Sequence, residues 1–209
     1  MRTFVYVDGF NLYYGALKGT PHKWLDIKAL VGKLLIPGHE IVKIKYFTAR
    51  VSGTPGNPNC AARQDAYIRA LVATCGVEVY YGHFSTHTKK CRRADGKGFI
   101  EVFQTDEKGS DVNLATHLVS DAHKRSFDAA IVVTNDSDLC EPVRIVAQEM
   151  RRKVGVLMPL ATPGRQPSIA LRKVATFTKP IRVGACQSSQ LPEIVTVDGQ
   201  EVHRPAEWR

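Results

Sequence analysis

The sequence predicts a three-layer α/β domain whose central sheet is mainly parallel. Short apolar runs alternate along the chain with stretches of helical periodicity. Three of these runs, FVYV, AAIVVT and VGVLM, are continuously apolar. A strand with this pattern is buried on both faces, which is typical of a parallel sheet covered by helices. We therefore expect right-handed crossovers between neighbouring strands.

The expected elements follow one another in a regular order. The strands are predicted at residues 3–7, 41–51, 77–84, 99–104, 129–134 and 154–158. The helices are predicted at residues 26–35, 60–74, 111–125 and 139–151. Segments rich in glycine and proline indicate loops at residues 52–59, 93–98 and 161–167.

The C-terminal part of the chain has a looser composition. We expect one domain over residues 1–179 and a tail over residues 180–209, which docks on the domain or on a second copy of the chain. Within the tail, Asp198 and Gly199 separate two short extended stretches, a pattern that predicts a two-residue hairpin. A homodimer is compatible with such a tail.

Composition narrows the class of protein. The 209 residues are 44% hydrophobic and 23% charged, as in ordinary globular domains. Its five scattered cysteines form no CxxC pair, which favours a reducing cytoplasm over a disulfide framework. We expect neither a signal peptide nor a membrane span, because Asp8 interrupts the N-terminal apolar run and no run approaches the roughly 18 to 20 residues of a span.

The charge of the chain is basic. Twenty-nine lysines and arginines against 20 acidic residues give a formal charge of +9 and a pI near 9.4. Such an excess favours a polyanionic partner such as nucleic acid through counterion release, although it also serves solubility alone.

Carboxylates follow the predicted strands. Asp8 ends the first strand, Asp136 and Asp138 follow the strand at 129–134, and Asp111 opens a helix. In a parallel sheet, the carboxyl ends of the strands and the amino ends of the following helices share one edge, where ligands bind. We therefore expect these four aspartates to meet at that edge.

Each aspartate also has a simpler interpretation as a cap or turn residue. Asp136 or Ser137 is suited to cap one helix, Ser110 or Asp111 another, and Asp8-Gly9 is a common turn pair. Four carboxylates at one edge would repel by about 4 kcal/mol per pair at about 4 Å and an effective dielectric of about 20. A divalent cation is the usual compensation, and oxygen ligands favour Mg²⁺ or Mn²⁺ over zinc. Such an ion suits phosphodiester hydrolysis by a nuclease or a phosphatase.

Three motifs carry a family resemblance. VDGFNLYYG, KGSDVNLATHLVSDA and VVTNDSDLCEPVRIV, in this order, resemble the NYN domain family, in the LabA-like branch of the PIN-like nucleases. The resemblance covers roughly residues 3–178, and the tail sequence RPAEW is similar to that branch as well. It implies a Rossmann-like PIN fold, metal-dependent ribonuclease activity and an acidic site at the carboxyl edge of the sheet.

Carried over to this sequence, the resemblance implies catalytic and metal-binding roles for Asp8, Asp111, Asp136 and Asp138. It implies supporting roles for Asn11, Thr134 and Ser110, of which Asn11 is also suited to cap a helix. Many PIN nucleases have a further acidic residue on a middle helix, and the sequence offers no convincing equivalent, since Asp65 and Glu78 are poorly placed. The number of metal ions therefore stays open.

Basic and aromatic residues near the motifs are candidates for substrate binding: Lys108, Tyr13, Lys89, Lys90, Arg92 and Arg93. We expect residues 80–93 to run from a strand into a basic loop near a phosphate backbone. His83, His87 and Cys91 in this stretch are spaced for zinc only on a helix, so a zinc site is disfavoured. Tyr13 and Tyr14 are candidates to stack on bases, and one of them is suited equally to the core.

Three functions compete at this point. The first is a Mg²⁺- or Mn²⁺-dependent endoribonuclease that hydrolyses RNA. The second is an RNA-binding or regulatory module that does not cleave, in line with the missing middle acid. The third is a pyridine-type hydroxylase, a name that some similar proteins carry, but no GxGxxG motif follows a strand.

Overall fold

The computed structural model describes residues 1–209 and contains a central sheet of six parallel strands. Its strands are β1 (Arg2–Asp8), β2 (Glu40–Thr48), β3 (Val77–Tyr81), β6 (Ala129–Val133), β7 (Lys153–Pro159) and β8 (Phe177–Ile181). They lie in the order β3-β2-β1-β6-β7-β8, and every neighbouring pair is parallel. The predicted α/β class is confirmed, and the sheet is wholly parallel.

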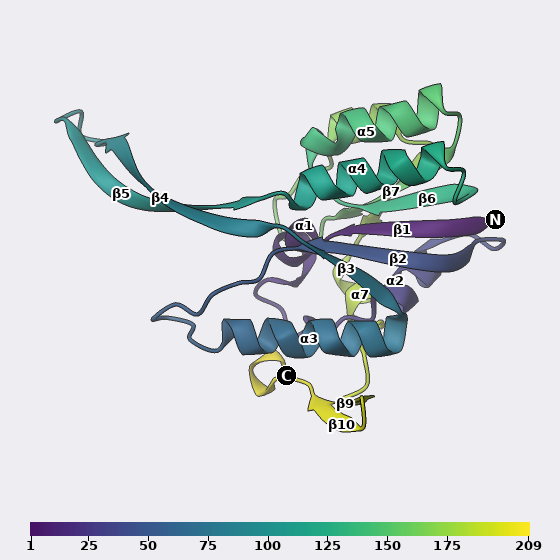
Figure 1. Ribbon diagram of the computed structural model, residues 1–209, viewed down its shortest axis with the longest axis horizontal. Helices are drawn as coiled ribbons and strands as arrows, with labels where there is room; N and C mark the ends of the chain where they lie inside the picture. The colour runs from purple at the N-terminus through teal and green to yellow at the C-terminus, as the bar shows by residue number, and fades with distance from the viewer.

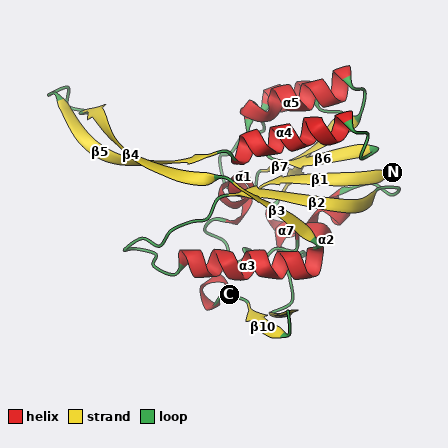
Figure 2. Ribbon diagram, in the orientation of Figure 1, coloured by secondary structure: helices red, strands yellow, loops and turns green.

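Helices cover both faces of the sheet, as Figures 1 and 2 show. One face carries α4 (Ser110–His123), α5 (Cys140–Arg144) and α6 (Ile169–Val174), and the other carries α2 (Ile27–Leu34), α3 (Cys60–Cys75) and α7 (Val183–Gln187). Strand β1 shows why the sheet needs both layers. Phe4 and Tyr6 pack into the core under α4, whereas Val5 and Val7 pack into the core under α2 and α3.

Strand order reverses beside β1. From β1 the chain crosses to β2 and β3 on one side, and from β6 it crosses to β7 and β8 on the other. The carboxyl ends of β1 and β6 therefore flank a topological switch point, where the connections leave in opposite directions and a crevice opens. The short helix α1 (Gly9–Leu12) and the wide π-type turn η1 (Tyr13–Leu17) follow β1 directly at this point.

An antiparallel arm projects from the domain. It consists of β4 (His83–Arg92) and β5 (Phe99–Lys108), which pair along their whole length, and it extends well beyond the helical layers in Figure 1. Lys89, Lys90 and Arg92 therefore lie on a strand, and the prediction of a basic loop was wrong for them. Thr86 and Thr88 favour an extended backbone, and pairing with β5 satisfies the backbone of β4. Arg93 begins the turn at the tip.

The arm begins where the predicted strand 77–84 is interrupted. Gly82 separates β3 from β4, and a Cβ atom at this position would lie only 2.4 Å from the carbonyl oxygen of Lys108. A glycine is thus needed where the two strands of the arm meet the domain. The predicted strand at 99–104 belongs to this arm and not to the central sheet.

Other boundaries also differ from the prediction. The expected helix 139–151 divides into the 3-10 turn η2 (Ser137–Leu139), helix α5 and the π-type turn η3 (Ile145–Glu149). Pro142, which lacks an amide hydrogen, lies in the first turn of α5, where that hydrogen has no helical partner. Strand β8 was not predicted and is the outer strand next to β7.

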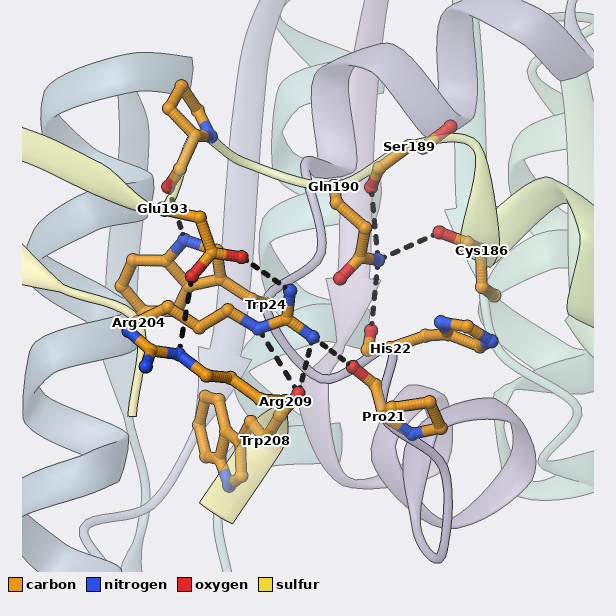
Figure 3. A network of polar contacts seen from close by, with 11 residues as sticks. Pro21, His22, Trp24, Cys186, Ser189, Gln190, Glu193, Arg204, Trp208 and Arg209 are labelled. Carbon is orange, nitrogen blue, oxygen red and sulfur yellow. Dashed lines mark hydrogen bonds and ion pairs between the residues drawn. The ribbon is translucent and has the colours of Figure 1, made fainter. Parts of the chain in front are cut away.

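The C-terminal segment docks on the α3 side of the domain (Figure 1). Strands β9 (Ile194–Val197) and β10 (Gln200–His203) form a hairpin whose turn contains Asp198 and Gly199, and the 3-10 turn η4 (Ala206–Trp208) ends the chain. Figure 3 shows the polar contacts that hold it. Trp24 donates to the Pro192 carbonyl at 2.7 Å, and the Arg204 guanidinium pairs with Glu193 at 2.9 Å and donates from Nε to the Trp208 carbonyl at 3.1 Å. No helix in residues 1–209 has the length and apolar character needed to cross a membrane.

Candidate active site

Asp8 is the last residue of β1 and caps the helix that follows. Its Oδ1 accepts a hydrogen bond from the Asn11 amide at 2.9 Å, and its side chain fits the cap position because its backbone is still extended. Only 4% of Asp8 is exposed. The cap of this helix is therefore Asp8 and not Asn11, so the prediction that Asn11 could cap a helix was wrong.

Strand β6 brings a second set of groups to Asp8. Thr134, which follows β6 and is fully buried, donates from Oγ1 to Asp8 Oδ2 at 2.9 Å. The same hydroxyl accepts from the Asp136 amide at 3.1 Å. Asp136 in turn caps η2, because its Oδ1 accepts from the Asp138 amide at 2.9 Å. One threonine thus links the first and third motifs across the switch point.

Asn11 joins the loop after β6 to a second loop. Its side-chain oxygen accepts from the Asn135 amide at 3.0 Å and from the Arg165 guanidinium at 3.0 Å. Asn135 in turn accepts from the Ser168 amide at 2.8 Å. Arg165 lies in the predicted loop 161–167 and was missed as a site residue, since a single arginine among glycines and prolines carries no sequence signal.

Glu107 and Asp111 complete the acidic surroundings from the base of the arm and the start of α4. Ser110 donates from its amide to Glu107 Oε1 at 3.1 Å and from its hydroxyl to Oε2 at 2.7 Å. Ser110 and Asp111 lie in the first turn of α4, whose cap is Gly109 with a positive φ of 96°. Glu107 was also missed, although it directly precedes the second motif and stands four residues before Asp111.

These groups line one open pocket of about 240 Å³. Its walls are formed by Asp8, Phe10, Asn11, Tyr14, Glu107, Ser110, Asp111, Asp136 and Arg165. Three of the four predicted aspartates are therefore brought together, with Glu107 as a further carboxylate. Asp138 is exposed and outside the pocket lining, although its charge acts on Asp111.

The pocket raises the pKa of two of its carboxyl groups, Asp8 and Asp111. The pKa of Asp8 is raised to about 7. Burial is the main cause, the charges of Asp111 and Asp136 contribute to the rise, and the hydrogen bonds from Asn11 and Thr134 oppose it. The pKa of Asp111 is also raised, first by burial and then by the charges of Asp136, Glu107 and Asp138. Such mutual repulsion is what a bound cation or a nearby cationic substrate group would relieve.

The donor set suits a hard cation. All of its charged ligands are carboxylates, and no histidine or cysteine lines the pocket, a composition that fits Mg²⁺ or Mn²⁺ better than zinc. Across residues 1–209, no three histidine, cysteine, aspartate or glutamate side chains are already arranged as a metal site. Rotation of the partly exposed carboxylates of Glu107, Asp111 and Asp136 toward Asp8 would be required for an ion to be held.

The predicted substrate-binding residues lie in three places. Lys108 is exposed, and it alternates with Glu107 on β5, so it points away from the face that carries Glu107. The outer part of the arm carries Lys89, Lys90, Arg92 and Arg93, away from the base of the arm at His83 and Lys108. Tyr13 lines a neighbouring aromatic pocket, whereas Tyr14 lines both pockets.

Strand β4 carries His83, His87 and Cys91 on one face, whereas residues 80–93 were expected to run from a strand into a loop. Residues four apart along a strand are about 13 Å apart, too far to share one ion. The disfavoured zinc site thus has no support in this geometry.

Comparison with known proteins identifies similar chains. The family model described as the NYN domain matches residues 2–181. A protein named 6-hydroxy-3-succinoylpyridine 3-monooxygenase HspA from Pseudomonas putida is 30% identical over 224 positions, which cover 93% of this chain and 72% of that protein. A crystal structure of a protein of unknown function from Vibrio parahaemolyticus has a TM-score of 0.54 at 21% identity, and the match covers 91% of this chain and 96% of that one. The last of these supports the fold alone.

Proposed function

The chain belongs to the NYN domain family, which is part of the PIN-like nuclease superfamily, and we propose that it is a metal-dependent endoribonuclease in the LabA-like branch. The observation that carries the proposal is the convergence of Asp8, Asp111 and Asp136 on one pocket at the switch point of the sheet. The raised pKa values of Asp8 and Asp111 match carboxylates that await a cation. The formal charge of +9 favours a polyanionic substrate, and we place the reaction on RNA in the cytoplasm.

Each residue has a distinct part in the proposed site. Asp8, Asp111, Asp136 and the newly found Glu107 would hold Mg²⁺ or Mn²⁺, and Asp138 would add charge at its rim. When bound, the ion would stabilise the negative charge that develops on the phosphodiester during in-line attack. Thr134 and the Asn11 amide fix the two oxygens of Asp8, which limits the ways in which that carboxylate can face the ion.

Arg165 is the cation of the pocket. Its guanidinium is held by Asn11 and lies among the pocket walls, where it can donate to a non-bridging phosphate oxygen. The remaining substrate contacts are assigned to the arm, where Lys90 and Arg92 share the face of Glu107, Arg93 lies at the tip and Lys89 lies on the opposite face. Lys108 at the base of the arm and Tyr13 in the neighbouring aromatic pocket are assigned to flanking parts of the RNA.

The test is a cleavage assay with labelled single-stranded RNA in Mn²⁺, in Mg²⁺ or in EDTA, with Asp136→Asn alongside. The proposal expects internal cleavage with either ion and a loss on the order of a hundredfold or more in the variant. Equal cleavage by the wild type and the variant, or full cleavage in EDTA, would overturn it. Circular dichroism of the variant controls for folding.

A module that binds RNA without cleaving it is the alternative within the same family. Its motivation was the missing middle acid, and Glu107 weakens that motivation because it adds a carboxylate to the pocket. RNA that is bound but left intact under every metal condition would favour this alternative.

A monooxygenase is the second candidate function, because the relative from Pseudomonas putida carries that name at 30% identity. The chain has no GxGxxG motif after a strand, so the usual dinucleotide signature gives this function no help. Its test is the consumption of 6-hydroxy-3-succinoylpyridine by the purified protein in air-saturated buffer with NADH and added flavin. Turnover by the purified protein that is absent from a matched mock purification would favour it over the ribonuclease.

A further inference from the structure

A second pocket lies against the acidic one and has a different chemistry. It measures about 320 Å³ and is called here the aromatic pocket. Its rings come from α1, η1, β2, α3 and η4, and they are Phe10, Tyr13, Tyr14, Tyr46, Tyr67 and Trp208. Pockets of this size, apolar with a few polar groups, are typical of sites for small planar ligands or single nucleotides.

The hydroxyl of Tyr46 has no partner in the protein. The hydroxyls of Tyr6, Tyr67 and Tyr80 each donate to a protein acceptor, at 2.7, 2.9 and 2.9 Å. Tyr46 is only 7% exposed and lines the aromatic pocket, yet its hydroxyl makes no hydrogen bond within residues 1–209, although it is not sealed from the pocket space. A nearly buried donor without a partner is costly unless a ligand or water completes it.

Gly9 places this hydroxyl beside the acidic site. A Cβ atom at residue 9 would lie 2.8 Å from Tyr46 Cζ and 2.8 Å from its hydroxyl oxygen, so glycine is required for the ring to reach this position. Gly9 directly follows Asp8. Phe10 and Tyr14 line both pockets, so the two cavities share a wall.

The far wall of the aromatic pocket is held in place by polar contacts. Arg63 forms an ion pair with Glu207 at 2.7 Å, and the rings of Tyr67 and Trp208 meet edge to face with centroids 6.0 Å apart. The Arg204 contact to the Trp208 carbonyl seen in Figure 3 fixes the same turn. The pocket is therefore preorganised, which lowers the entropy cost of binding a flat ligand.

We infer that the aromatic pocket binds the nucleobase of the nucleotide whose phosphate occupies the acidic pocket. The inference rests on the proposed ribonuclease function for the phosphate and on the Tyr46 hydroxyl for the base. A base supplies a flat face for the surrounding rings and acceptor atoms for a tyrosine hydroxyl. A base within a stacked duplex could not enter this pocket, so the site selects single-stranded or unpaired nucleotides.

The test measures binding of the four nucleosides and of ribose as probes. EDTA is present, so that neither metal binding nor cleavage contributes to the signal. Trp208 lines the pocket, whereas Trp24, the other tryptophan, is fully buried and outside it. We expect at least one nucleoside to quench the tryptophan fluorescence in a saturable way and ribose to have no effect. Quenching by ribose equal to that by nucleosides, or no quenching at all, would overturn the inference.

Two tyrosine variants locate the site. Tyr46→Phe removes only the unpartnered hydroxyl and should weaken nucleoside binding about twofold to tenfold. Tyr80→Phe makes the same chemical change outside both pockets, where the hydroxyl donates to Glu78, and should leave nucleoside affinity unchanged. Equal affinities in wild type and Tyr46→Phe would contradict the assignment, as would tighter binding of a hydroxypyridine probe than of every nucleoside.

A cleavage assay separates this inference from the proposed function. An RNA that carries one abasic nucleotide should lose cleavage at that nucleotide while other sites are cut normally. Nucleoside binding without any RNA cleavage would contradict the proposed ribonuclease function and support the nucleobase site. Cleavage at the abasic nucleotide at the normal rate would contradict the nucleobase site and support the ribonuclease function.

Discussion

The hydroxyl of Thr134 donates to Oδ2 of Asp8 at 2.9 Å, although the two residues are 126 positions apart in the chain. Parallel pairing of β1 with β6 places the two strand ends side by side at the switch point. The contact is fully enclosed and acts against the burial and the neighbouring charges that raise the pKa of Asp8. Thr134 therefore helps to keep this carboxylate ionised.

Replacement of Thr134 by valine tests this role. Thr134→Val keeps the shape but removes a hydrogen bond to a charged group, which should move the acid limb of the cleavage profile about one to two pH units upward. Thr134→Ser keeps the hydroxyl and should behave like wild type. The measurement is the pH dependence of RNA cleavage, and superimposable profiles for valine and wild type would exclude the role.

The raised pKa of Asp8 also predicts how stability depends on pH. The unfolded carboxyl titrates near its ordinary value of 3.8, whereas the folded one titrates near 7. Between these values the unfolded chain releases a proton that the folded chain retains, so the contribution of Asp8 to stability falls as pH rises from about 4 to about 7. The total loss should be a few kcal/mol.

Asp8→Asn removes this titration. We expect the variant to gain unfolding free energy relative to wild type as pH rises through that range, with a constant difference above it. Urea unfolding at closely spaced pH values measures the difference. Mn²⁺ should stabilise wild type more at high pH than at low pH, because the ion requires ionised carboxylates. Parallel curves for the two proteins would show that Asp8 titrates normally.

The sequence was sufficient to place the parts of the site that lie at strand ends. Asp8, Thr134 and Asp136 follow continuously apolar strands, and the geometry of a parallel sheet then brings them to one edge. The helices α2, α3 and α4 were predicted closely because each has an apolar face along one continuous segment.

The rest of the site depends on where the chain turns. Glu107 reaches the pocket only because β5 pairs with β4 and returns the chain to α4, a pairing that local patterns do not specify. Arg165 reaches it through a loop whose path is fixed by Asn11 and Asn135. Long-range contacts of this kind leave no periodic signal in one sequence.

Glu107 offers a direct test of the enlarged carboxylate set. Glu107→Gln removes the charge but keeps an acceptor for Ser110, so the local fold should persist while Mn²⁺ affinity and cleavage fall on the order of tenfold to a hundredfold. Glu101→Gln, on the same strand and farther out on the arm, is the matched control and should change neither. Metal affinity can be followed by calorimetry, and equal behaviour of the two variants would remove Glu107 from the site.

The register of the arm predicts which cations contact RNA. Pairing of Phe84 with Glu107 and of Arg92 with Phe99 places Arg92 on the face that carries Glu107, whereas Lys89 lies on the opposite face. Phe99 and Phe103 share the face of Arg92 and are 69% and 83% exposed, as in surfaces that stack on bases.

Arg92→Ala should therefore weaken single-stranded RNA binding severalfold and reduce its salt dependence by about 0.7 in slope, the share of one phosphate contact. Lys89→Ala removes a cation from the other face and should have little effect. Filter binding over a range of salt concentrations gives both slopes. A larger loss in Lys89→Ala would assign the RNA to the opposite face of the arm.

A buried ion pair on the α4 side provides a test of stability that is separate from the site. Lys45 Nζ lies 2.5 Å from Asp121 Oδ2, and Tyr6 donates to the same oxygen at 2.7 Å. Asp121→Ala leaves the lysine charge buried without a partner and should lower the free energy of unfolding by about 3 to 5 kcal/mol, whereas Lys45→Met with Asp121→Leu should recover most of it. Denaturant unfolding measures both. Because neither residue lines either pocket, cleavage per folded molecule should stay at the wild-type level, and a selective loss of cleavage without a loss of stability would reveal a role for this pair in the reaction.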